Sequence, residues 1–286
     1  MPMKLSLSLL AVLGVSCWAD DLDFGVAKLQ WHSYGTHDSE RGATDLQFDQ
    51  WRLQSPLHQP LALTKDWYLL SGARYEQIHL DGPSATGAAF EEDLHLLELP
   101  MVLLYRPEGS DWSYNARISP GLSSDLDSIT TDDMFVDARL GGNYRWNEKM
   151  ELNFGVAYTR AVGEPQIFPY LGFVYQANDQ LRLQWRGFTV EARYRVMPSW
   201  VLRFTGEVVG GYWNIDTPES DYLALQSYRM GLTLERELAE DLWLVAGAGI
   251  TMANELRWQD NSHNTIRSDK FDGGSYFTLG LRLRDW

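Results

Sequence analysis

Apolar and polar residues alternate along most of the chain. The alternation is clearest in segments 181–186, 190–196 and 277–284, where apolar side chains take one parity and mainly Arg, Glu, Gln or Thr the other. Successive side chains of a strand point to opposite faces, so this pattern predicts β-strands with one apolar and one ionic face. Arg paired with carboxylates is typical of an interior ion network, whereas Lys, Ser and Thr suit a water-exposed face. The pattern therefore favours strands that face lipid on one side.

Two kinds of connection separate the predicted strands. Short polar turns lie near 64–66, 107–111, 147–149, 178–179, 197–199 and 239–241. Longer polar loops lie near 34–44, 80–93, 122–133, 161–166, 212–221 and 254–272, with a tight reversal at 186–187. Short and long connections alternate, which is typical of outer-membrane barrels. We predict an all-β fold, a transmembrane antiparallel up-and-down β-barrel of about 14 strands, with 12 as the alternative.

Two places in this barrel are expected to be irregular. The strand that ends at Arg186 is short, and Pro56 and Pro60 interrupt the segment 44–63. Proline removes a donor from the ladder, so we expect a bulge or a distorted strand there.

Aromatic residues flank the short turns. Trp67, Trp112, Trp200 and Trp243 follow turns, and Tyr105, Trp146, Tyr175 and Tyr194 precede them. Aromatic side chains at one level on both sides of a hairpin predict a girdle at a membrane interface.

The N-terminus has the pattern of an export signal. Lys4 precedes an apolar run over 5–15, and a small-x-small site over 17–19 ends before Asp20. We expect residues 1–19 to be a cleaved signal peptide and residues 20–286 to form one barrel domain. The alternative is lipidation of Cys17, against which Gly14 stands where an aliphatic residue is usual.

Cleavage after residue 19 would remove the only cysteine and change the formal net charge from −15 to −16. Disulfides would then be absent, and such an acidic chain is a poor partner for nucleic acid.

The stretch from Trp112 to Asp125, WSYNARISPGLSSD, reads as a strand that runs into a Pro-Gly turn. With the signal, the flanked hairpins, the acidic loops and the aromatic last residue, it resembles bacterial outer-membrane β-barrel proteins, including porin-like families of uncharacterised function. The resemblance implies an outer-membrane location, both termini in the periplasm, and contact with outer-membrane lipid and the assembly machinery. Trp286 departs from it, because its parity is opposite to that of Leu281 and Leu283.

Alternation assigns a set of charged residues to the lumen, and arginine outnumbers the acids in it. The set is Arg74, Glu76, Arg117, Asp137, Arg139, Arg145, Arg182, Arg186, Glu191, Arg193, Arg195, Arg203, Glu207, Arg229, Glu235, Arg282 and Arg284. Arginine rings favour anions in pores. The alternative is an ion-pair network that fills the interior and conducts nothing.

Acidic residues cluster in one predicted outer loop, at Asp125, Asp127, Asp132 and Asp133. Clustered carboxylates suit a hard cation such as calcium, but the run lacks the glycine and the terminal glutamate of an EF-hand. We expect a solvated acidic loop, no bound metal and no cofactor.

Outer-membrane hydrolases use a histidine beside serine or paired aspartates. The histidines available are His32, His37, His58, His79, His95 and His263. His79 with Asp81, and His95, would meet at the rim if their strands formed one hairpin. No serine follows at a recognisable spacing, so we expect no enzymatic activity.

The sequence thus favours an outer-membrane barrel that is either porin-like, passing small anionic solutes through an arginine-lined lumen, or structural. The alternatives are a rim-site hydrolase acting on lipid or peptide, and a soluble periplasmic β-barrel or sandwich. The oligomeric state stays open.

Overall fold

A computed structural model describes residues 26–40, 44–160 and 165–283. The predicted signal peptide with Cys17, and the residues Arg284 and Trp286, lie outside the described residues. No helix in the described ranges is long and apolar enough to cross a membrane.

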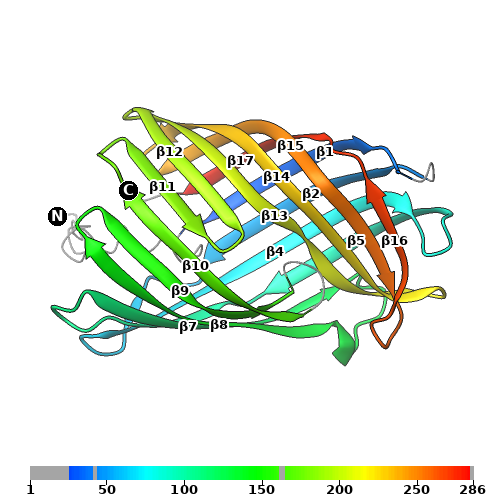
Figure 1. The fold of residues 1–286 in the computed structure, drawn as a ribbon, viewed down its shortest axis with the longest axis horizontal. Coiled ribbons are helices and arrows are strands. Elements are labelled where there is room, and N and C mark those ends of the chain that lie inside the picture. The colour runs from blue at the N-terminus through cyan, green and yellow to red at the C-terminus, as the bar shows by residue number, and fades with distance from the viewer. Residues whose placement is uncertain (1–25, 41–43, 161–164, 284–286) are drawn as a thin grey trace, which may run out of the picture.

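Seventeen β elements follow one another along the chain and form one sheet (Figure 1). They are β1 (Lys28–His37), β2 (Leu46–Pro56), β3 (Leu61–Ala62), β4 (Trp67–Pro83), β5 (Ala89–Glu98), β6 (Met101–Tyr105), β7 (Trp112–Ser124), β8 (Met134–Asn147), β9 (Met150–Thr159), β10 (Gln166–Gln176), β11 (Leu181–Arg186), β12 (Thr189–Met197), β13 (Trp200–Thr217), β14 (Ser220–Ala239), β15 (Leu242–Gln259), β16 (Thr265–Phe271) and β17 (Ser275–Leu283). A single 3-10 turn, η1 (Thr131–Asp133), is the one helical element in the described ranges.

These elements make fourteen barrel strands, because three of the strands are interrupted. β4 pairs with both β2 and β3 along one edge and with both β5 and β6 along the other. β15 pairs in the same way with β16 and β17. β1 pairs with β2 and with β17, so the antiparallel ring closes. The predicted strand number is confirmed.

The predicted irregularities are also present. β2 ends at Pro56 and the strand resumes only at Leu61, beyond Pro60. β11, the strand that ends at Arg186, has six residues.

The ring has two distinct ends. At the end that we call the terminal end, β1 begins, β17 finishes and short turns join neighbouring strands. The connections between β4 and β5, between β13 and β14 and between β15 and β16 lie at the opposite end, which we call the far end (Figure 1).

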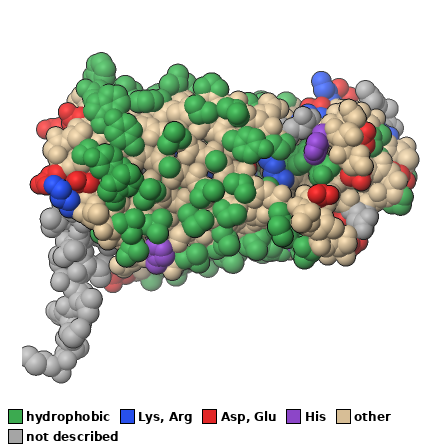
Figure 2. Space-filling view, turned by 90° about the horizontal axis from the view of Figure 1, so that it is seen from below, with side chains coloured by type: hydrophobic (Ala, Val, Ile, Leu, Met, Phe, Trp, Pro, Cys, Tyr) green, Lys and Arg blue, Asp and Glu red, His purple; other side chains and the backbone are tan. Residues whose placement is uncertain are grey.

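The outer face of the terminal half is apolar. Side chains such as Leu53, Leu140, Val190, Leu232 and Leu279 are exposed there. Figure 2 shows hydrophobic side chains over the body of the barrel and charged ones mainly near its two ends. Since a barrel satisfies its backbone polar groups without water, a closed ring with an apolar belt suits a lipid bilayer.

The apolar side moves from outside to inside between the two halves. On β4 the apolar residues Trp67 and Leu69 point outward in the terminal half. In the far half the apolar residues Ile78 and Leu80 point inward, and His79 and Asp81 point outward. Residues of nine labelled elements, which belong to eight barrel strands because β16 and β17 form one strand, build one buried apolar core. Its buried members are Tyr34, Leu46, Phe48, Ile78, Leu80, Leu94, Trp213, Ile215, Leu223, Leu225, Leu256, Trp258, Phe271 and Tyr276. We call this set the far core.

The predicted long loops at 80–93, 212–221 and 254–272 were wrong, because strands that carry the far core occupy most of these residues. β4 and β5 leave only residues 84–88 between them, β13 and β14 leave 218–219, and β15 and β16 leave 260–264. The physical reason is that Leu80, Trp213 and Leu256 gain burial only when their strands continue beyond the apolar belt.

β13 changes neighbours between its two ends. In the terminal half it pairs with β12 as far as Glu207, and beyond that point no described strand pairs with this edge until Asn214 meets Ser124 of β7. The Ser123 hydroxyl also donates to the Tyr212 carbonyl oxygen at 2.6 Å. β8 to β12 separate β7 from β13 in the terminal half. The barrel is therefore wide in its terminal half and narrow in its far half.

The aromatic girdle is present in part. Trp67 and Tyr105 have ring centroids 4.7 Å apart, as do Trp112 and Tyr144, and both tryptophans are exposed. Trp243 is different, because it is 1% exposed and lies inside. Its odd parity is shared with the inward residues of β15, so its prediction as a girdle residue was wrong.

Candidate functional site

A polar cavity of about 300 Å³ lies inside the terminal half, below the far core. We call it the chamber. Its charged lining residues are Lys28, Arg52, Arg117, Arg139, Arg186, Glu191, Arg193, Arg203, Glu207, Arg229 and Arg282. They come from strands all around the ring, because alternate residues of each strand point inward.

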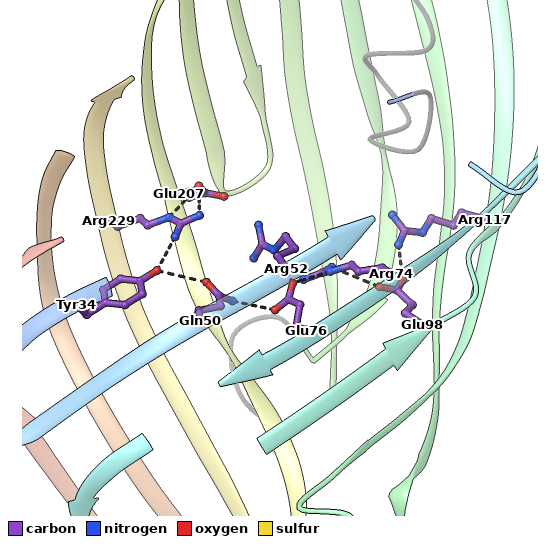
Figure 3. A network of polar contacts seen from close by, with 9 residues as sticks. All are labelled: Tyr34, Gln50, Arg52, Arg74, Glu76, Glu98, Arg117, Glu207 and Arg229. Atoms are coloured by element: carbon purple, nitrogen blue, oxygen red, sulfur yellow. Dashed lines mark hydrogen bonds and ion pairs between the residues drawn. The ribbon is translucent and has the colours of Figure 1, made fainter. Parts of the chain in front are cut away.

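One ion-pair network crosses the chamber wall from β14 to β7 (Figure 3). Arg229 binds Glu207 at 2.9 Å and also contacts the Tyr34 hydroxyl, which donates to Gln50. The Gln50 amide then donates to Glu76 at 2.9 Å.

The same network continues through glutamates that bridge arginines. Arg52 Nε lies 2.7 Å from Glu76, and Arg74 pairs with both Glu76 and Glu98. Glu98 also pairs with Arg117. Figure 3 shows these side chains as one chain of contacts across neighbouring strands.

A second network lies on β12, β13, β14 and β17. Arg203 contacts Glu191 and Glu235, each at 2.7 Å. Arg193 pairs with Glu191, and Arg282 lies 3.4 Å from Glu235. Glu235 is 0% exposed, so bulk water does not compensate its charge and the neighbouring arginines do.

Positive charge exceeds negative charge around the chamber. The lining carries nine cationic side chains. Five glutamates line the chamber or pair with its arginines, namely Glu76, Glu98, Glu191, Glu207 and Glu235. Arg139 has no carboxylate partner among the described residues, and its guanidinium lies 4.6 Å from the centre of the Tyr170 ring.

The residues that sequence alternation assigned to the lumen occupy three kinds of position. Arg117, Arg139, Arg186, Glu191, Arg193, Arg203, Glu207, Arg229 and Arg282 line the chamber. Arg74, Glu76 and Glu235 lie behind that lining and pair with each other or with its arginines. Arg182 and Arg195 are half-buried, Arg145 is exposed near the Asn147–Lys149 turn, and Asp137 accepts a hydrogen bond from Thr159. None of these four lines the chamber.

Sequence reasoning missed His32, Arg52, Thr233 and Thr278, all of which line the chamber. Alternation along β1 could have placed His32 in the lumen, because His32 has the parity opposite to that of the lipid-facing Leu29.

Two of the four candidate metal ligands, Asp125 and Asp133, bind backbone groups of the connection that carries all four. Asp133 accepts from Asn214 at 2.8 Å and forms a capping box with Thr130 around η1. Asp125 accepts from the backbone N–H of Asp127. Asp127 and Asp132 are exposed, as expected for a solvated loop, whereas Asp125 and Asp133 are buried. No group of three or more potential metal ligands occurs in the described ranges.

The candidate catalytic residues lie on the outer surface of the β4–β5 hairpin, beyond the apolar belt. His79 contacts Asp93 at 2.9 Å and Glu91 at 3.5 Å, not Asp81. The hydrogen bond that the His79 ring donates to the Asp93 carboxylate is the main cause of the raised pKa of His79. His95 contacts the Tyr75 hydroxyl. His79 and His95 therefore make separate contacts and do not combine into one site.

The family model for a domain of unknown function, DUF6268, matches residues 37–284. The chain belongs to this family. Its structure is similar to that of the COG4313 outer membrane channel from Pseudomonas putida F1, with 13% identity, a TM-score of 0.48 and coverage of 90% of this chain and 94% of the channel. No curated protein matches the sequence.

Two further solved structures are similar over most of their length. The KdgM porin has 9% identity and a TM-score of 0.37, with 91% of this chain and 99% of the porin covered. The translocator domain of the autotransporter NalP from Neisseria meningitidis has 9% identity and a TM-score of 0.39, with 97% and 96% covered. The closed ring and its apolar belt make this DUF6268 protein a porin-like outer-membrane β-barrel, which removes the soluble alternative.

Proposed function

We propose that this protein passes small anionic solutes across the outer membrane through the chamber, with its terminal end in the periplasm and its far end outside. The observation that carries the proposal is the excess of cationic over anionic side chains around the chamber. Charges withdrawn from water need compensation. A small anion supplies it where the protein's own carboxylates do not.

The chamber does not continue as an open pore through the far half. Eight strands contribute to the far core. Barrels of about 8 strands are filled by side chains, whereas those of 16 or more leave a channel. Passage along the barrel axis therefore requires the far core to part, and we expect a low conductance for the unmodified protein. The same core favours the second candidate function, a structural barrel that conducts nothing.

Planar bilayers with a potassium chloride gradient test the proposal. We expect small conductance steps and a reversal potential of the sign given by chloride preference. Arg139→Gln should lower that preference, because Arg139 lines the chamber without a carboxylate partner in the described ranges.

Arg236→Gln is the matched control. Arg236 lies outside the chamber, with its guanidinium 5.1 Å from the centre of the Trp200 ring, so the reversal potential should stay unchanged. Cation preference, or an equal effect of both substitutions, would contradict anion passage. Complete absence of conductance would leave the structural barrel as the function.

A further inference from the structure

Three polar side chains on one wall of the chamber lack hydrogen-bond partners. His32 lies on β1, Thr278 on β17 and Thr233 on β14, and all three line the chamber. Both ring nitrogens of His32 and both threonine hydroxyls are buried without a partner among the described residues. We call these three residues the His32 wall.

The register of the sheet brings the members of the His32 wall together. His32 pairs directly with Thr278. Thr278 pairs with Gly247 of β15, and Gly247 pairs with Thr233. A Cβ atom at position 247 would collide with the Thr233 side chain. The glycine therefore lets Thr233 lean over β15 toward Thr278.

Burial makes the missing hydrogen bonds significant. His32 is 3% exposed and Thr278 is 6% exposed. A buried polar group without a partner costs the full desolvation of that group, and nearly all such groups in proteins are satisfied. Three of them on adjacent positions, all facing one cavity, indicate a guest that makes several hydrogen bonds at once.

The surrounding charge selects the sign of that guest. The charged groups that act on His32 are Arg229, Arg52 and Lys28, all cations. Each of them also lines the chamber. Arg229 and Arg52 also bind Glu207 and Glu76. Because cations outnumber carboxylates around the chamber, a further cation at this wall would be repelled, whereas an anion would be attracted.

We propose that the His32 wall is a binding subsite for one small oxyanion, of which inorganic phosphate is the simplest. One imidazole N–H and the two threonine hydroxyls donate to its oxygens, while Arg229 and Arg52 offset its charge. A cavity of about 300 Å³ holds such an ion and several waters. The proposal rests on the proposed function in one respect, namely that anions enter the chamber, and it adds a discrete site and its ligand class.

Binding of radiolabelled inorganic phosphate to the folded protein in detergent, by equilibrium dialysis at constant ionic strength, tests the subsite. The unmodified protein should bind one phosphate per chain. Thr233→Val combined with Thr278→Val keeps the shape of both side chains and removes both hydroxyls. Because hydrogen bonds to charged groups are the strong ones, we expect this variant to bind about tenfold more weakly or worse. His32→Ala should weaken binding similarly.

Thr189→Val is the matched control, since Thr189 lines the same chamber from β12, two strands away from β14, which carries Thr233. It should bind phosphate as the unmodified protein does. Heat-modifiable gel mobility checks that each variant is folded, and the isosteric double variant keeps the test valid if His32→Ala does not fold.

The outcomes separate the subsite from the proposed function. No phosphate binding by the unmodified protein, or equal binding by the double variant and the control, would overturn the subsite even if the bilayers show chloride preference. In that case water satisfies the three groups. Phosphate binding that depends on the His32 wall supports the subsite, and it does so even if no current is found.

Discussion

At the residue scale, Glu235 is the acid whose loss should affect stability most. It is fully buried and accepts from Arg203 at 2.7 Å, with Arg282 at 3.4 Å. Glu235→Gln keeps the shape but leaves cationic groups uncompensated, and breaking a buried ion pair costs about 3–5 kcal/mol. We expect a corresponding loss in the free energy of unfolding, measured by urea titration in lipid vesicles.

Glu240→Gln provides the comparison for this prediction, because Glu240 is exposed in the turn before β15. A surface change of this kind alters stability by about 0.5 kcal/mol or less. Equal stability of the two variants would mean that water reaches the Arg203 cluster and neutralises it without Glu235.

At the element scale, alternation predicted the strands of the terminal half well and those of the far half poorly. The outward orientation of Trp185 and Val190 can be predicted from their immediate neighbours in the sequence, because a strand that faces lipid needs only alternate residues to be apolar. Phe90 is different, since its partner is Trp258, with ring centroids 4.7 Å apart on a strand distant in sequence. Between Asp81 and Asp93 the chain looks like a polar loop until Trp258 is placed beside it. The far core therefore could not be predicted from the local pattern of apolar and polar residues.

The chamber also combines features that the local sequence predicts with features that depend on distant strands. The inward parity of arginines such as Arg193 and Arg203 is local information, and the chamber contains them. Which side chain each arginine contacts depends on how distant strands are arranged in the ring, as for Arg229 and Tyr34, which are far apart in sequence. The sequence pattern could also not reveal that the lumen is closed, because closure depends on the neighbours of β13.

β13 offers a prediction of its own at Gly210. This residue lies between the last pair with β12 and the contact with β7, and its φ of 143° is in the region that favours glycine. A Cβ atom there would collide with the Leu225 carbonyl oxygen. Gly210→Ala should therefore destabilise the barrel by about 1 kcal/mol or more.

Gly206→Ala on the same strand is the control, since nothing lies within 4 Å of the position of its Cβ. Unfolding midpoints in urea would compare the two variants. If Gly210→Ala were as stable as Gly206→Ala, the backbone of β13 would not need the glycine in order to cross toward β7.

At the scale of the whole molecule, two barrels of opposite character share the same strands. The terminal half has an apolar outside and a mainly ionic inside, with a small apolar cluster at Leu70, Val102 and Leu104. The far half has a polar outside and an apolar inside, as a soluble barrel does. The change takes place within single strands such as β4. The far core both stabilises the barrel and closes the axial path above the chamber.

Trp213→Ala separates these two roles of the far core. Trp213 is buried on β13 at the level where the barrel narrows, and truncation of a buried tryptophan costs about 3–5 kcal/mol. Because a narrow barrel is closed by its side chains, we expect conductance in planar bilayers to rise by about twofold or more. Trp51→Ala removes the same side chain from the outer face, where Trp51 is exposed, and should leave conductance unchanged. An unchanged current through folded Trp213→Ala would mean that solutes do not cross the far core. Any current would then have to leave the chamber beside β13, along the edge between Glu207 and Asn214 that no described strand covers.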